Sequence, residues 1–139
     1  MATLTGFARW VCGTTGAALL ACTAHAQTAH IDQITGNLAT ITQQGVGNSA
    51  TLEQTAIAGA YAGNISSVSQ DGTGNQSSIV QHGQDNGAAI GQYGNNNAAL
   101  VGQFGAGLRT DIQQTGNGLS VQINQSGHGA GLPVTIRQY

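Results

Sequence analysis

The sequence predicts an all-β fold, a cross-β β-solenoid of about five two-strand rungs with an 11-residue half-repeat. Between Gln43 and Gln125, a glutamine recurs every 11 residues with a single exception. A phrase of the form small–x–aliphatic–x–Gln precedes each one, as in Ala39-Thr40-Ile41-Thr42-Gln43. With 22 glycines, 6% charged and 4% aromatic residues, the 139-residue chain lacks the large apolar side chains of a thick globular core. These observations indicate one small unit stacked repeatedly on itself.

Residues 1–26 are predicted to be a secretory signal peptide. Arg9 supplies a positive charge, residues 10–22 are mostly apolar or small, and Ala24-His25-Ala26 is a small–x–small cleavage signature before Gln27. The apolar stretch is shorter than the roughly 20 residues that a membrane-spanning helix needs. Residues 27–139 are therefore expected to form the mature repeat domain.

A lipoprotein signal is the alternative for the same segment, because Leu19-Leu20-Ala21 precedes Cys22. Cys12 and Cys22 are the only cysteines of the chain, and both lie in the leader. Cleavage after Ala26 would leave no thiol for a disulfide or a thiolate metal site.

Alternate residues of each phrase share one face, because successive side chains of a strand point to opposite sides of the sheet. We number each unit from the Gly of Gly-Asn, as in Gly36-Asn37, which puts the aliphatic residue at position 6 and Gln at position 8. Positions 4, 6 and 8 are expected to point inward, and positions 5 and 7 outward. The predicted aliphatic core is position 6 of ten strands: Ile31, Ile41, Leu52, Val68, Ile79, Ile90, Val101, Ile112, Ile123 and Ile136.

Glycine at position 10 is expected to reverse the chain between strands, since glycine reaches positive φ freely. The predicted turn glycines are Gly45, Gly72, Gly83, Gly94, Gly105, Gly116 and Gly127. Asparagine at position 2 is suited to the same turns, because its side chain bonds nearby backbone and tolerates strained conformations.

Pairing of alternate strands would give two sheets with a rung spacing of about 4.8 Å. The first strand is expected at residues 29–33, which carry the same phrase. Residues 56–62 hold an insertion that one turn can accommodate at modest cost. The last unit is atypical, with Pro133 just before its strand, as is common in terminal repeats.

Stacking would place equivalent residues directly above one another, so that amide side chains form ladders along the axis. One sheet would align Gln33, Gln54, Gln81, Gln103 and Gln125, and the other Gln43, Gln70, Gln92, Gln114 and Gln138. The asparagines predicted to form further ladders are Asn37, Asn48, Asn64, Asn75, Asn86 and Asn97.

The repeat resembles a known family. Residues 43–54 match the curlin repeat Q-x-G-x-G-N-x-A-x3-Q at every defined position. Residues 70–81 match with Ser77 in place of Ala, and residues 92–103 match with Asn96 in place of the second Gly. The resemblance extends over roughly residues 29–139.

Resemblance to curlins implies a secreted bacterial subunit that self-assembles into curli, the functional amyloid fibres of the biofilm matrix that serve adhesion and surface colonisation. The implied partners are further copies of the chain, a sister curlin subunit, an outer-membrane secretion pore and periplasmic chaperones. The aliphatic phrase in nearly every half-repeat favours a nucleator. The Gly-Asn pairs and the terminal Gln138-Tyr139 favour a major subunit, and the two roles stay open.

The composition argues against several other functions. The mature chain would keep only two arginines, which is no basic footprint for nucleic acid. His30, His82 and His128 occupy different repeat positions, so we expect no metal site. The carboxylates are scattered, and no catalytic motif appears, so we expect no enzyme and no cofactor.

The main alternative is a soluble β-solenoid that binds ice or carbohydrate through a flat outer face. Such a face needs identical outward residues on each rung, and only Thr40 and Thr42 provide a Thr-x-Thr pair. The slot just after Gln holds Tyr93, Phe104 and Tyr139, with His82 in the same slot. Stacking of these rings at a strand edge is the first interpretation, and a dye or ligand groove is a secondary one.

Overall fold

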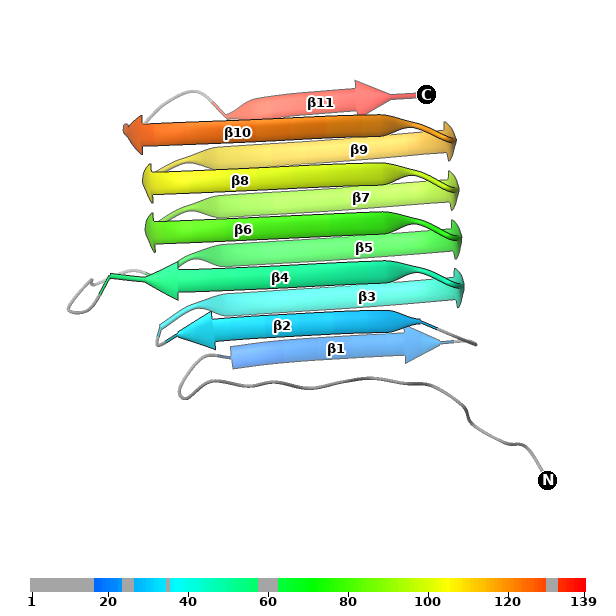
Figure 1. Cartoon of the computed structure of the whole chain (residues 1–139), viewed down its shortest axis with the longest axis horizontal. Helices are drawn as coiled ribbons and strands as arrows, with labels where there is room; N and C mark the ends of the chain where they lie inside the picture. The colour runs from blue at the N-terminus through cyan, green and yellow to red at the C-terminus, as the bar shows by residue number, and fades with distance from the viewer. Residues whose placement is uncertain (1–16, 24–26, 35, 58–62, 130–132) are drawn as a thin grey trace.

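Eleven strands and no helix make up the described part of the chain. The structure is a computed structural model, and it describes residues 17–23, 27–34, 36–57, 63–129 and 133–139. Figure 1 shows the strands stacked in two layers, with successive strands running in opposite directions. No helix among the described residues is long and apolar enough to cross a membrane.

The strands form two parallel sheets, which we name the odd sheet and the even sheet. The odd sheet has the order β1 (Ala17–Thr23), β3 (Leu38–Val46), β5 (Ile65–Thr73), β7 (Gly87–Asn95), β9 (Arg109–Asn117) and β11 (Val134–Gln138). The even sheet has the order β2 (Thr28–Ile34), β4 (Ser49–Ala56), β6 (Gln76–Gln84), β8 (Ala98–Ala106) and β10 (Ser120–His128). This arrangement confirms the predicted β-solenoid.

Neighbouring strands pair in the register of the repeat. Ile41 lies opposite Val68 and Gln43 opposite Gln70 in the odd sheet, and Gln81 lies opposite Gln103 in the even sheet. A slip of one residue would turn every inward side chain outward, so the buried face fixes this register.

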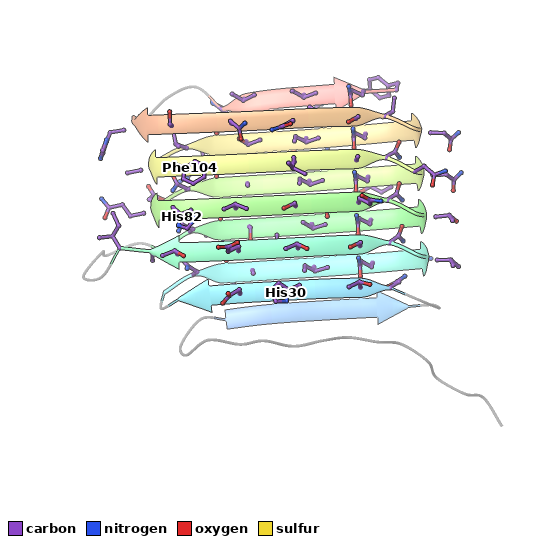
Figure 2. All side chains as sticks on the ribbon, in the orientation of Figure 1. His30, His82 and Phe104 are labelled. Atoms are coloured by element: carbon purple, nitrogen blue, oxygen red, sulfur yellow. The ribbon has the colours of Figure 1, made fainter. Side chains whose placement is uncertain are left out.

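The interior is one narrow layer between the two sheets. Burial alternates along the strands, and in β6 every even position is buried. Aliphatic side chains such as Ile41, Leu52 and Ile79 are completely buried. Small residues at position 4, such as Ala39 and Ala50, complete the hydrophobic cluster. The sticks in Figure 2 form columns along the stack, because each rung repeats the chemistry of the one beneath it.

At position 10, close approach of the backbone on the next rung requires glycine in five units, at Gly45, Gly72, Gly83, Gly94 and Gly105, whereas Ala56 occupies the same position beside the insertion. Gly83 has a φ of +123°, and a Cβ built on it would lie 1.8 Å from the carbonyl oxygen of Gly105. The other turn position, position 1, has positive φ in the described units except at Gly63, and two of these units have a side chain there. Asp85 and Asn96 adopt φ of 53° and 56° there, since short polar residues enter the left-handed region most easily.

β1 lies within the predicted signal peptide. Its residues pair in parallel with β3, from Ala17 opposite Leu38 to Thr23 opposite Gln44. This strand is an addition to the ten that the repeat predicts. Residues 1–16 and 24–26, including the predicted cleavage signature, lie outside the described residues, so processing stays a prediction. Most of the predicted insertion, residues 58–62, lies outside them as well.

Replacing Gly83 with alanine is expected to destabilise the folded protein by about 3 kcal/mol or more. The new Cβ adds a steric conflict with Gly105 to the cost of positive φ. The free energy of unfolding from guanidinium titration measures the loss. Gly118→Ala is the matched control, because Gly118 has φ of +69° and open space around it, and it should cost about 1 kcal/mol. Equal losses for the two variants would refute the close-approach argument.

Candidate assembly core

Glutamine side chains at position 8 form two continuous amide ladders through the interior. In each ladder, Nε2 of one glutamine donates to Oε1 of the glutamine on the next rung. The odd-sheet bonds are Gln43 to Gln70 at 2.7 Å, Gln70 to Gln92 at 2.8 Å, Gln92 to Gln114 at 2.9 Å and Gln114 to Gln138 at 2.8 Å. The even-sheet bonds are Gln54 to Gln81 at 2.7 Å, and Gln81 to Gln103 and Gln103 to Gln125 at 2.8 Å.

The second N–H of each amide crosses to the opposite sheet. Gln81 Nε2 donates to the carbonyl of Ile65 at 3.2 Å, and Gln92 Nε2 donates to the carbonyl of Gln76 at 2.9 Å. The acceptor is in each case the first residue of the preceding strand, which belongs to the other sheet, so each glutamine links the two sheets. The seven position-8 glutamines from β3 to β9 are each at most 1% exposed. Amide groups buried this deeply need a hydrogen-bond partner for each donor and acceptor.

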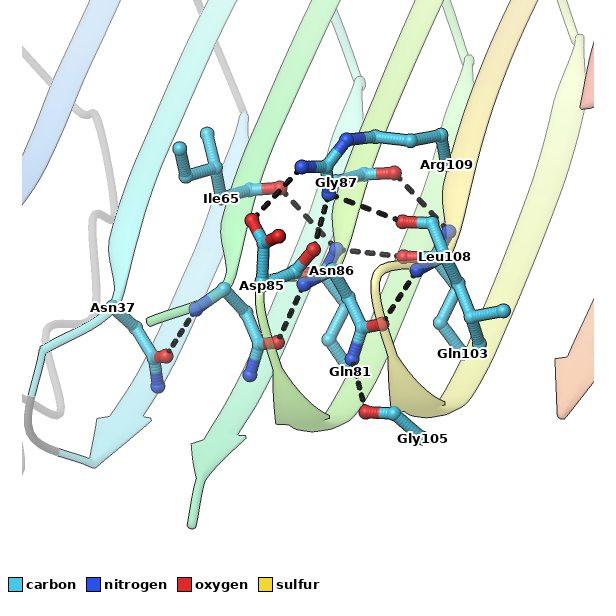
Figure 3. Close-up of polar contacts among 11 residues, drawn as sticks. Asn37, Ile65, Gln81, Asp85, Asn86, Gly87, Gln103, Gly105, Leu108 and Arg109 are labelled. Atoms are coloured by element: carbon cyan, nitrogen blue, oxygen red, sulfur yellow. Dashed lines mark hydrogen bonds and ion pairs between the residues drawn. The ribbon is translucent and has the colours of Figure 1, made fainter. Parts of the chain in front are cut away.

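Asparagine at position 2 forms ladders of another kind, between a side chain and the backbone. Asn37 Oδ1 accepts from the backbone N–H of Asn64 at 2.8 Å, and Asn64 Oδ1 accepts from that of Asn86 at 3.2 Å. Asn86 Nδ2 also donates to the carbonyl of Gly105 at 3.0 Å. Figure 3 shows this series continuing from Asn86 to the N–H of Leu108.

The asparagine ladders end before the C-terminus. Leu108 and Leu119 occupy position 2 of the following units, and each receives one last bond through its backbone N–H. Leucine has no side-chain amide, so the series of hydrogen bonds ends at these two residues. Of the two kinds of side-chain ladder, only the glutamine ladders continue into the C-terminal rungs.

The predicted site residues are placed together almost without exception. The six asparagines are buried, and the glutamines lie in two columns. Gln33 is opposite Gln54 by backbone register, but its side chain lies outside the described set. Ile123 is buried, and Ile136 packs against the same cluster while partly exposed.

Thr110 is an interior polar residue that the sequence pattern did not single out. Thr110 Oγ1 donates to Gln125 Oε1 at 2.7 Å, and it lies 3.1 Å from Gln103 Nε2, whose N–H it shares with the other acceptors of that amide. The sequence feature that could have identified Thr110 is a threonine at position 4, where most units have the smaller residues Ala or Ser. Ser66 and Ser77 occupy the same position, and their buried hydroxyls have no hydrogen-bond partner.

An ion pair on the outer surface was also not predicted. Arg109 Nη2 lies 2.9 Å from Asp85 Oδ1, and Arg109 also donates to the backbone carbonyl of Asp85. The side chains are 45% and 57% exposed, so solvent limits the contribution of the pair to about 0–1 kcal/mol. The ion pair joins the turn before β7 to the first residue of β9, and so links two neighbouring rungs (Figure 3).

The described residues include no group of three or more His, Cys, Asp or Glu that could hold a metal ion. Figure 2 shows His30 and His82 on different strands and at different points along them. The interior instead offers amides and aliphatic groups, which do no acid–base or nucleophilic chemistry. The arrangement repeats the same chemistry from one rung to the next.

The fold and its ladders define a class of protein, a parallel β-solenoid in which identical residues stack in register. A family model described as the curlin associated repeat matches residues 35–59 and 83–127, together just over half of the chain. The chain therefore belongs to the curlin family of repeat proteins. Comparisons with curated proteins and with solved structures give no match.

Replacing Gln81 with leucine is expected to lower the free energy of unfolding by about 2–4 kcal/mol. The variant keeps the volume of the side chain but leaves buried groups of Gln54, Gln103 and Ile65 without their partner. Gln84→Leu is the control on the same strand, because Gln84 is exposed, and it should change stability by less than about 0.5 kcal/mol. Similar denaturation midpoints for the two variants would contradict a structural role for the ladder.

Proposed function

We propose that this protein is a secreted structural subunit that polymerises into curli-type amyloid fibres by end-on stacking of β rungs. The observation that supports this most strongly is the exact repetition of register from one strand pair to the next in both sheets. A surface that matches the rung beneath it also matches the corresponding rung of another copy.

The C-terminal tip has the chemistry needed to receive a second copy. β10 and β11 are the last strands of their sheets, and the outer edge of each offers unpaired backbone groups. Gln125 and Gln138 each donate one N–H to a backbone carbonyl, of Arg109 and of Ser120 respectively. Their second N–H corresponds to the one that binds the next glutamine at every interior rung.

The mature N-terminal edge is complementary to this tip. With the leader removed, β2 of an incoming copy would lie on β10, and β3 on β11. Continuation of the repeat then sets Gln33 above Gln125 and Gln43 above Gln138. Arg137 would face Thr42, so the junction brings no like charges together.

Docking of preformed copies alone is only marginally favourable. About 10 backbone hydrogen bonds at a net of about 1 kcal/mol each compare with an association cost of about 4–15 kcal/mol. Growth becomes strongly favourable when the tip also templates the folding of the incoming chain, since one docking event then forms several rungs. We therefore propose a mature monomer that is largely disordered until a fibre end captures it. The folded state that Gly83→Ala and Gln81→Leu destabilise is accordingly that of the chain within a fibre, and the guanidinium titrations are made on preformed fibres.

Family membership supports the cellular setting of this proposal. The expected location is the extracellular surface of a bacterium, within a biofilm matrix. The expected partners are a sister curlin subunit, an outer-membrane secretion pore and periplasmic chaperones.

An ice- or carbohydrate-binding face has less support. One outward column of the odd sheet aligns Thr40, Ser67, Ala89 and Asp111. A regular ligand lattice needs the same group on every rung, and this column provides four different ones.

Purified residues 27–139 are expected to give a disordered far-UV circular dichroism spectrum when fresh. They should then convert to β structure in step with thioflavin-T fluorescence after a lag. Addition of fragments of preformed fibres should abolish the lag, because the fragments supply ready tips. A chain that stays monomeric with a stable β spectrum would refute the proposal.

Replacing Ile136 with aspartate is expected to slow seeded elongation at least tenfold. Ile136 is part of the inward column, so the junction would bury a charge without a partner. Arg137→Asp is the control, since Arg137 is exposed on the same strand and lies opposite the uncharged Gln113, and this variant should elongate at nearly the wild-type rate. Equal elongation rates for the two variants would exclude β11 from the junction.

A further inference from the structure

The two sheets of the described chain contain unequal numbers of strands. The odd sheet has six strands and the even sheet has five. The additional strand is β1, which lies within the predicted leader and forms the N-terminal edge of the odd sheet (Figure 1). Without β1, the remaining described strands divide equally, five to each sheet, as the half-repeat predicts.

β1 occupies the backbone edge of β3. Its seven residues pair with β3 in parallel and in the register of the repeat. By this register Ala18 lies opposite Ala39 at position 4, and Leu20 lies opposite Ile41 at position 6. The leader thus supplies the small–x–aliphatic part of the phrase, without its glutamine. It pairs as a half-repeat does, on the edge that the proposed function assigns to the neighbouring copy.

Equal strand numbers allow the mature chain to continue from one copy to the next. Each added strand lengthens its sheet by about 4.8 Å, so equal numbers of strands give two sheets of equal length. When β2 of a mature copy pairs with β10 of the preceding copy, β3 reaches β11 at the same spacing. Both sheets are then continuous across the junction.

Precursor copies cannot join in this way, because the odd sheet of each is longer by one strand. If β2 pairs with β10 of the preceding copy, β1 falls at the place that β11 already fills. If β1 instead pairs with β11, β2 and β10 are separated by two strand spacings, about 10 Å, and no backbone hydrogen bond forms between them. Either arrangement interrupts one of the two sheets.

β1 also interrupts the glutamine ladder at a junction. The register places Cys22 opposite Gln43, at position 8. At a mature junction Gln138 would meet Gln43 of the next copy, whose amide oxygen accepts hydrogen bonds. At a precursor junction Gln138 would meet Cys22 instead. A thiol is a weak hydrogen-bonding group and has no amide with which to continue the series.

We propose that the leader is an autoinhibitory strand, which prevents end-on growth until processing removes it. Pairing of β1 with β3 blocks the N-terminal edge through the mismatch in strand number, and the predicted cleavage after Ala26 restores the match. The C-terminal tip of a precursor stays open, so one precursor added to the N-terminal edge of a mature fibre stops growth there. This inference rests on the proposed function and adds a control over when assembly begins.

The test compares seeded elongation of the full chain, residues 1–139, with that of residues 27–139. The seeds are fragments of fibres of residues 27–139, and fibre length is measured by electron microscopy. The full chain should elongate at least tenfold more slowly. Consecutive N–H groups of a strand face opposite sides, so one of those at residues 20 and 21 faces β3. The double variant Leu20→Pro/Ala21→Pro of the full chain removes both and should restore elongation to within about threefold of the mature rate.

Leu20→Val/Ala21→Val is the matched control, because valine favours a strand, and it should elongate as slowly as the unmodified full chain. Equal elongation of the full chain and of residues 27–139 would overturn the inference and leave the proposed polymerisation intact. A proline variant as slow as the valine variant would also overturn it, since the bulk of the leader rather than its strand would then be responsible. Failure of residues 27–139 to elongate would refute the proposed function, and this inference with it.

Discussion

The structure depends on the requirement that every buried amide has partners. A glutamine in a narrow apolar interior would be strongly destabilising alone, because its donors and acceptor would lose water without replacement. Here each glutamine between the tips bonds the glutamines above and below it and one strand of the opposite sheet. Those three partners exist together only when the rungs are in strict register. The ladders therefore specify the fold as well as stabilise it.

The thinness of the interior follows from the same arrangement. The two sheets approach closely because position 4 holds only small or β-branched residues, such as Ala39 and Thr110. The aliphatic column then fills the middle, and the amides occupy the end of the layer near the turns. Unlike a globular core, this interior needs no contact between distant parts of the chain beyond the neighbouring rung. A protein built this way can lengthen without any change in its packing.

Much of this architecture could be predicted from periodicity, because a single spacing fixes strands, turns and register together. The alternation around Ile79 and Gln81 identified the inward face, and the recurrence of Gly83 identified the turn. The exceptions are informative. Asp85 and Asn96 adopt the left-handed conformation where other units use glycine, and Arg109 finds its partner one rung away. Such contacts depend on side-chain directions across rungs, which one repeat does not reveal.

The aromatic slot and the predicted leader show two further limits of the pattern. Phe104 and His82 are 22 residues apart, and only the pairing of β6 with β8 makes them neighbours. β1 lies in a segment whose composition indicates targeting, so the pattern gave no reason to expect its pairing with β3.

The direction of the glutamine bonds has an electrical consequence. In both described ladders every Nε2 donates toward the C-terminal rung, so the side-chain dipoles add head to tail, as peptide dipoles do in a helix. Reversing one amide would break bonds on both sides of it, which makes the orientation collective, and a filament of aligned copies would carry an axial dipole that grows with its length.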